Sequence, residues 1–153
     1  METASVPLGK ALYVASARDE SWLQNMQRTL FQQRQKQPDY VFAKLWGLIT
    51  DPHNLRIAFA RVAANRGRRT AGIDGQTVRN VIDWVGRTTF LAKLREDLSP
   101  GEYPPRPTQR VLIPKSGHPG KHRPLGIPTV RDRTVQGWLR PPYFAQVYGE
   151  PDA

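Results

Sequence analysis

The apolar residues of this chain recur at helical spacing between positions 22 and 98, and this spacing stops at Ser99-Pro100-Gly101. Apolar side chains at intervals of three and four residues form one face of a helix, whereas strict alternation is typical of a strand. Beyond the break, prolines alternate with other residues from Tyr103 to Pro107, and a residue before proline favours extended backbone. The sequence therefore predicts an α+β fold that is mainly helical and contains one β-hairpin.

Capping residues and prolines divide the first part of the chain into three predicted helices. Asp19 or Ser21 is placed to cap the first helix, and Pro38 separates it from the second. Asp51 followed by Pro52 is a favourable cap and first-turn pair for a third helix, which ends near Asn65. Each helix has one apolar stripe: Trp22, Leu23, Met26, Leu30 and Phe31 in the first, Val41, Phe42, Leu45, Leu48 and Ile49 in the second, and Leu55, Phe59 and Val62 in the third.

Three further helices are predicted later in the chain. A short helix can form over residues 77–85, and a longer one has its apolar residues over 90–98. Thr129 is placed to cap a last helix that continues to Leu139 and is interrupted by Pro141-Pro142.

The hairpin is predicted between the last two of these helices. Residues Gln109–Ile113 and His122–Ile127 are typical of strands, and the segment Ser116–Gly120 between them is rich in turn formers. Pro124 and Pro128 restrict the second strand to the edge of a sheet. A two-stranded hairpin is marginally stable in water, so it is expected to depend on packing against the helices or a partner.

We divide the chain into four parts. A length of 153 residues allows one sizeable hydrophobic core. Residues 1–18 have no periodicity and predict a flexible leader. Residues 19–98 form a helical part that contains a basic loop at 65–76, residues 99–140 contain the hairpin and the helix after it, and residues 141–153 form an irregular tail.

The charge of the chain indicates a polyanionic partner. Lys and Arg number 23 and Asp and Glu number 13, which gives a net charge of +10. Self-repulsion of this size opposes folding, so we expect a partner such as RNA. The chain has no cysteine and no apolar run of the roughly 18 residues needed to cross a bilayer, so we expect a cytoplasmic protein without membrane association.

The basic residues gather in two places. The first is the loop after the third predicted helix, where few acids are nearby, and the second is the hairpin segment, where Glu102 and Asp132 are the only acids. Arginine and lysine side chains bind phosphate oxygens, so both places are candidate nucleic-acid contacts. The candidates are Arg61, Arg66, Arg68 and Arg69 in the first place, and Arg106, Arg110, Lys121, Arg131 and Arg133 in the second.

Lys115 and Arg123 form a separate candidate site within the hairpin segment. Lys115 ends the first predicted strand, and the hairpin turn brings Arg123 close to it. An ammonium group beside a planar guanidinium suits a triphosphate.

Three motifs give the chain a family resemblance. Tyr103 is followed by two prolines at alternate positions, then by Arg110–Lys115 (RVLIPK) and Arg123–Arg133 (RPLGIPTVRDR). Together with the earlier segment Ala71-Gly72-Ile73-Asp74-Gly75, these motifs resemble the group II intron-encoded reverse transcriptases and maturases, over about residues 20–140. The resemblance implies the N-terminal extension and part of the fingers of a right-hand polymerase.

The resemblance also implies residue roles. Lys115 and Arg123 correspond to residues that contact the triphosphate of the incoming nucleotide. The segment around Arg69 to Thr77, which includes Gly72, Ile73, Asp74 and Gly75, corresponds to a lid-like loop over the template and primer. The preceding helices correspond to an extension that binds intron RNA.

The carboxylates that hold two Mg²⁺ ions in this family lie beyond the resembling segment. We therefore expect no catalytic residue, no metal ligand and no cofactor in this chain, and we interpret it as truncated before the palm and inactive alone as an RNA-directed DNA polymerase. Asp132 is flanked by two arginines at a predicted helix start, where the helix dipole favours an acid, so it does not replace those carboxylates. Two alternatives stay open: a fingers subunit that complements a separately encoded palm-containing polypeptide, and a gene remnant without function.

Simpler interpretations accompany each candidate group. The arginines can form a solvated charged face, Lys115 and Arg123 can be ordinary surface charge, and Gly72, Asp74 and Gly75 can serve only as a turn in which the glycines have positive φ. Burial is favoured over base stacking for the four tryptophans. The histidines have no spacing that indicates zinc. These residues are Trp22, Trp46, Trp84 and Trp138, and His53, His118 and His122.

Overall fold

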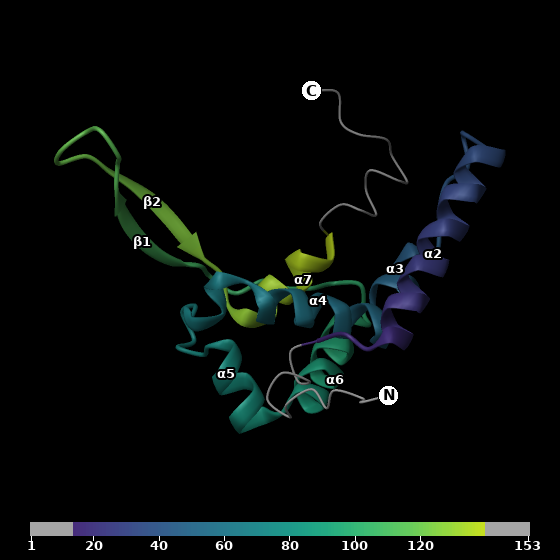
Figure 1. Cartoon of the computed structure of the whole chain (residues 1–153), viewed down its shortest axis with the longest axis horizontal. Helices are drawn as coiled ribbons and strands as arrows, with labels where there is room; N and C mark the ends of the chain where they lie inside the picture. Colours follow the sequence, from purple (N-terminus) through teal and green to yellow (C-terminus); the bar gives the residue numbers. More distant parts are fainter. Residues whose placement is uncertain (1–13, 140–153) are drawn as a thin grey trace, which may run out of the picture.

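Helix α4 (Pro52–Ala64) lies at the centre of the computed structural model, which describes residues 14–139 (Figure 1). The Asp51 side chain caps it by accepting a hydrogen bond of 2.9 Å from the His53 backbone N–H, and Pro52 occupies the first turn. Most of its residues are buried, because other helices pack on several of its faces. The third predicted helix is thereby confirmed, including its end beside Asn65.

The hydrophobic core forms where α4 meets the helices that follow it. These are α5 (Val78–Asn80), the π-helical turn η2 (Val81–Val85), α6 (Arg87–Leu98) and α7 (Val130–Leu139). Helix α7 packs on α4 at Gly137, where a Cβ atom would lie at an ordinary contact distance of 3.7 Å from Cγ2 of Val62. The buried core residues are Leu55, Phe59, Val62, Ala63, Val78, Val81, Leu91, Leu94, Leu98 and Val130.

Helix α2 (Ala17–Lys36) projects from this core and is attached to α4 at its N-terminal end (Figure 1). Its cap is Ser16, whose hydroxyl accepts a hydrogen bond of 3.1 Å from the Asp19 backbone N–H. Asp19 is the third residue of the helix and completes a capping box with Ser16. The prediction that Asp19 or Ser21 caps this helix was therefore wrong. The same carboxylate pairs with Arg56 of α4 at 2.7 Å.

The second predicted helix is shorter than its apolar stripe indicates. Between Pro38 and Asp51, the only helix is α3 (Leu45–Ile49), and none of its residues is buried. Val41, assigned to the stripe, is 81% exposed. Turns at 38–39 and 43–44 occupy the first part of this segment, so the helix begins only at Leu45.

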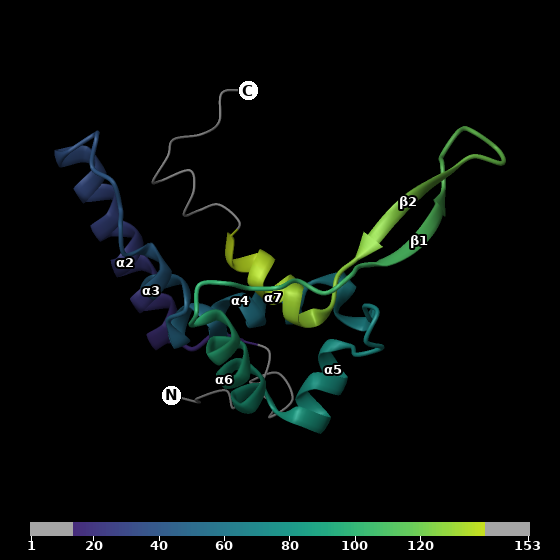
Figure 2. The same ribbon diagram turned by 180° about the vertical axis from the view of Figure 1, so that it is seen from behind.

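Strands β1 (Gln109–Pro114) and β2 (His122–Ile127) form an antiparallel hairpin, in which Gln109 is opposite Ile127 and Pro114 is opposite His122. The hairpin projects from the helices on the side away from α2, and it is the only sheet among residues 14–139 (Figure 1). The extended connection from α6 to β1 crosses α7, as Figure 2 shows from behind. The mainly helical α+β fold with one hairpin is confirmed.

The prediction that the tryptophans are buried was wrong for Trp84, which is 74% exposed. It lies in the turn η2, where the chain changes direction before Gly86, so the helical stripe does not continue into α6. Trp46 is also exposed, although its indole N–H donates to the carbonyl of Leu98 at 3.0 Å. Trp22 is partly buried and stacks on His53, and the side chain of Trp138 lies outside the described part.

Two other expectations fall outside the described residues: the irregular tail over 141–153, which includes Pro141-Pro142, and most of the leader over 1–18. Within the described range, no helix combines the length and hydrophobicity needed to span a membrane.

Candidate nucleic-acid interface

The basic segment after α4 is a single 3₁₀ turn, η1 (Arg66–Arg69), which we call the arginine loop. The sequence predicted an irregular loop, but the backbone N–H of Thr70 donates to the carbonyl of Gly67 at 2.9 Å and closes the turn. The side chains of Arg66, Arg68 and Arg69 are exposed and have no ion pair or hydrogen bond within residues 14–139. Arg61 is also exposed, one helical turn earlier in α4.

The lid-like loop, Gly72–Gly75, follows directly and is a tight turn. The backbone N–H of Gly75 donates to the carbonyl of Gly72 at 3.0 Å, and the Asp74 carboxylate accepts from the Gln76 backbone N–H at 3.1 Å. Gly75 has the predicted positive φ, at 71°. Ile73 is exposed at the apex.

Gly72 has a role that the sequence prediction missed, because its φ is not positive. A Cβ atom at this position would lie 2.7 Å from Cα of Thr129 and 2.9 Å from the carbonyl carbon of Pro128. Gly72 is therefore required for close approach of two backbone segments. This contact holds the lid-like loop against the residues between β2 and α7.

The hairpin tip, which we define as Lys115, Lys121 and Arg123, presents three cations on one face. Arg123 is directly opposite Ile113, and the backbone N–H of Lys115 donates to the carbonyl of Lys121 at 2.8 Å. Opposed residues share a face of an antiparallel pair and alternate residues return to it, so these cations lie on the face of Ile113. All three side chains are exposed, and none has an ion pair in the part of the chain that the structure describes.

The same hairpin face is apolar nearer its base, where Val111 is opposite Leu125. Both are exposed. Arg110 points to the other face because it is one residue out of phase with Val111. Arg106, before β1, is exposed as well.

Arg131 and Arg133, in the first turn of α7, are partly buried and already have internal partners. Arg131 lies over the ring of Tyr103, 4.5 Å from its centroid, and donates to Asp97 at 2.9 Å. Arg133 donates to the carbonyl oxygens of Gly67 and Thr70 at 2.8 and 2.7 Å. The predicted nucleic-acid contacts thus divide into exposed cations and two that stabilise the fold.

Asp132 connects the base of the hairpin to α7, which the sequence did not reveal. Its carboxylate accepts from the Tyr103 hydroxyl at 2.6 Å and from the Arg106 backbone N–H at 3.0 Å. Burial and the hydrogen bond to Asp132 raise the pKa of Tyr103 above its usual value of 10.0, so the phenol stays protonated at neutral pH. The available signal was the spacing Thr129-x-x-Asp132: the Thr129 hydroxyl accepts from the Asp132 backbone N–H and donates to its carboxylate, which fixes that carboxylate at the helix start.

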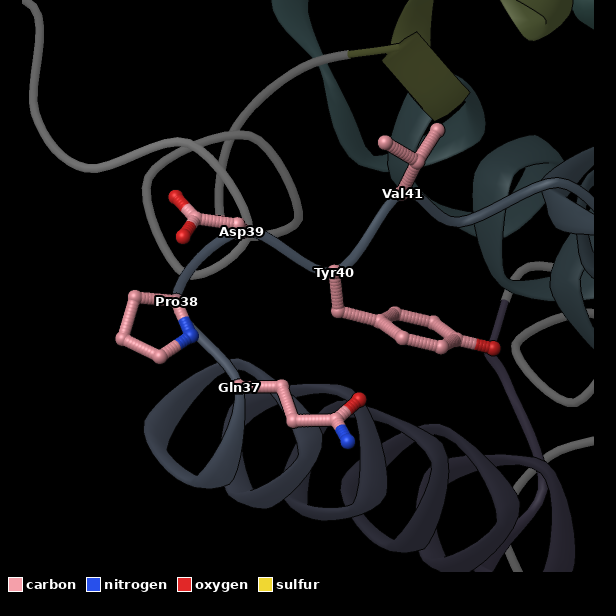
Figure 3. Close-up of a pocket in the computed structure, with 5 residues that line it drawn as sticks. All are labelled: Gln37, Pro38, Asp39, Tyr40 and Val41. Carbon is pink, nitrogen blue, oxygen red and sulfur yellow. The ribbon is translucent and has the colours of Figure 1, made fainter.

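No cluster of metal ligands marks a different site in the described part of the chain. Among residues 14–139, no three His, Cys, Asp or Glu side chains lie together as metal ligands. His118 and His122 are exposed, and His53 contacts Asp19. A surface pocket at the end of α2 is lined by residues 37–41 (Figure 3), and it lies away from the exposed cations described above.

Known proteins have sequences that are similar to this chain. Protein YkfC of Escherichia coli strain K12 is 40% identical to this chain over 114 residues, which are 74% of this chain and 29% of YkfC. Group II intron-encoded protein LtrA of Lactococcus lactis subsp. cremoris is 31% identical over 106 residues, which are 69% of this chain and 17% of LtrA. LtrA of strain MG1363 gives the same values.

The chain is similar to a group II intron-encoded protein. This similarity supports the relationship to reverse transcriptases and maturases that the sequence motifs indicate. The chain spans less than a third of the length of each of these curated relatives. No protein-family model matches it.

Proposed function

We propose that this chain binds structured RNA through the arginine loop and the hairpin, as the N-terminal extension and partial fingers of a group II intron-type reverse transcriptase. The observation that carries the proposal is the set of exposed cations on these two elements, which have no acidic partner among residues 14–139. The name of LtrA, a group II intron-encoded protein, agrees with an RNA partner.

Phosphate is the ligand that these side chains suit. Guanidinium groups donate paired hydrogen bonds to phosphate oxygens, and exposed groups can do so without first breaking an internal ion pair. The two elements are also held together, because Gly72 beside the arginine loop packs on Thr129 beside the hairpin. One RNA molecule can therefore contact both elements.

Binding of the 153-residue chain to a fluorescently labelled RNA stem-loop, measured by anisotropy at several salt concentrations, tests the proposal. We expect affinity to fall steeply with salt, by about 0.7 to 0.9 in the log–log slope for each phosphate contacted. The triple substitution Arg66→Gln, Arg68→Gln and Arg69→Gln is expected to reduce that slope by about 2 to 3, because each residue contributes about one contact.

A matched triple variant controls for net charge alone. Arg18→Gln, Arg28→Gln and Lys36→Gln remove the same charge from exposed positions on α2, on the other side of the molecule from the hairpin. This control should keep the wild-type slope. A flat salt response of the unmodified chain, or equal losses in the two triple variants, would contradict the proposal.

The shared face of Lys115 and Arg123 favours a second role, which is binding of a nucleoside triphosphate in complex with a palm-containing polypeptide. We expect no primer extension by this chain alone with RNA template, Mg²⁺ and nucleotides. Extension is expected when a polypeptide with the metal-binding aspartates is added, and Lys115→Gln should then raise the KM for nucleotide. An unchanged KM in that complex would contradict this role.

A further inference from the structure

The side chain of Arg133 reaches from α7 back to the arginine loop, 66 residues earlier in the chain. Its two terminal nitrogens donate to two different carbonyl oxygens, Gly67 at 2.8 Å and Thr70 at 2.7 Å. These carbonyls belong to a residue within the 3₁₀ turn and to the residue that follows it. One guanidinium group therefore spans the turn that carries Arg66, Arg68 and Arg69.

The geometry of guanidinium explains why this contact fixes the turn. The group is planar and its N–H donors have fixed directions, so two simultaneous hydrogen bonds determine where both carbonyls lie. An ammonium group donates from a single nitrogen and cannot hold two separated acceptors in the same way.

The guanidinium group of Arg133 also has no exposed donor nitrogen that is free to contact RNA. Both terminal nitrogens donate inward, and Nε is buried without a hydrogen-bond partner in the described part of the chain. Burial lowers the pKa of Arg133 from its usual value, although the nearby charge of Asp74 partly offsets this. These are properties of a group built into the fold.

Two neighbouring contacts hold the same region. Gly72 packs directly on the backbone of Thr129, as described above. The amide of Gln109, oriented so that both of its polar atoms are satisfied, donates to the carbonyl oxygens of Gly72 and Ala71 at 3.2 and 3.3 Å. The arginine loop is thus held to α7, and the segment directly after it is held to the hairpin.

We propose that Arg133 is a positioning residue for RNA binding: it holds the arginine loop so that Arg66, Arg68 and Arg69 face the RNA, and it does not itself contact phosphate. This inference rests on the proposed RNA-binding function of the loop. The sequence places Arg133 among the cations that contact nucleic acid, whereas this inference gives it a structural role instead.

A charge-preserving substitution in the full chain distinguishes positioning from direct contact. Arg133→Lys keeps the charge and loses one or both carbonyl contacts, so we expect RNA affinity to fall about fivefold or more. Arg28→Lys, at an exposed position on α2 outside the proposed interface, is the matched control and should stay within about twofold of wild type. Wild-type affinity in Arg133→Lys would overturn the proposal, because RNA binding would then not depend on the paired hydrogen bonds that hold the loop.

A double-mutant cycle tests whether the effect acts through the loop. In a chain that already carries Arg66→Gln, Arg68→Gln and Arg69→Gln, Arg133→Lys is expected to cause no further loss of affinity. A loss as large as in the wild-type background would overturn the proposal.

Hydrogen exchange of the Thr70 amide, measured without RNA, separates failure of this inference from failure of the proposed function. We expect faster exchange in Arg133→Lys, because the hydrogen bond from Thr70 to Gly67 loses its support. Unchanged exchange would overturn the positioning role. If exchange is faster in Arg133→Lys but the unmodified chain does not bind RNA, the proposed function is overturned. The role of Arg133 in holding the loop would then still stand.

Discussion

Asp19 and Asp132 occupy equivalent places in two helices and differ in their partners. Each is the third residue of its helix, each pairs with a hydroxyl residue three positions earlier, and each is 3% exposed. Asp19 accepts hydrogen bonds from the cationic group of Arg56 and contacts His53 at 2.7 Å. Asp132 accepts from the phenol of Tyr103 and a backbone N–H.

The comparison shows that a buried aspartate at a helix start attaches both α2 and the hairpin to the core, by different chemistry. In both helices a hydroxyl cap three residues earlier places a buried carboxylate at the helix start, and the tertiary fold supplies its remaining partners. At α2 the partners are side chains of α4, so the attachment depends on charge. At the hairpin the partners belong to the connection that crosses α7, so the attachment depends on neutral donors.

The largest effect on stability is expected at the hairpin attachment. Asp132→Ala leaves the Tyr103 hydroxyl and the Arg106 backbone N–H without their acceptor, which should reduce the free energy of unfolding by about 3 kcal/mol. Urea denaturation measures this. Tyr103→Phe removes one donor only and is expected to cost less, so an equal loss in both variants would show that the carboxylate has no wider role.

A somewhat smaller effect is expected where the lid-like loop meets the same attachment. Gly72→Ala places a methyl group 2.7 Å from Cα of Thr129, and relief of this overlap should cost about 2 kcal/mol. Gly47→Ala is the control, because nothing lies within 4 Å of its Cβ position. If thermal denaturation gives the same midpoint for both variants, the close approach at Gly72 is not a constraint.

The smallest effect is expected at α2, where it should also depend on pH. Burial alone raises the pKa of Asp19, but hydrogen bonds from Arg56, Ser16 and His53 outweigh it, and the net pKa lies well below the usual 3.8. A depressed folded-state pKa adds stability above the unfolded value, which is lost as the pH falls from about 4 through the folded value. Asp19→Asn should cost about 1.5 kcal/mol at pH 7.

Denaturation of both chains between pH 7 and pH 2 measures the pH dependence. The difference between wild type and Asp19→Asn should narrow as the pH falls below about 4, because the wild-type carboxylate is then protonated in the unfolded state. A difference that stays constant over this range would mean that the charge of Asp19 does not stabilise the attachment.

Local sequence signals predicted much of the fold. The hairpin strands, the start of α4 at Asp51-Pro52 and the cap of α7 at Thr129 all follow from turn formers, proline and hydroxyl side chains that act within a few residues. The prediction failed for Val41 and Trp84 because helical spacing alone does not show whether another element covers a stripe.

The candidate interface was predictable in composition and not in detail. The sequence located the exposed cations of the arginine loop and the hairpin tip, since loops and edge strands keep charged side chains in solvent. It could not separate Arg133 from Arg123, because their difference comes from carbonyl groups distant in the sequence.

By itself, the sequence determined the starts of α4 and α7, the hairpin and the basic character of the chain, because these depend on residue type and short-range hydrogen bonds. Only the tertiary structure decided that Gly72 packs on Thr129, that Asp132 accepts a hydrogen bond from Tyr103 and that Arg133 binds the carbonyls of the arginine loop. Those contacts join residues 29 or more positions apart, and they form only when α7 packs on α4 and brings the three segments together.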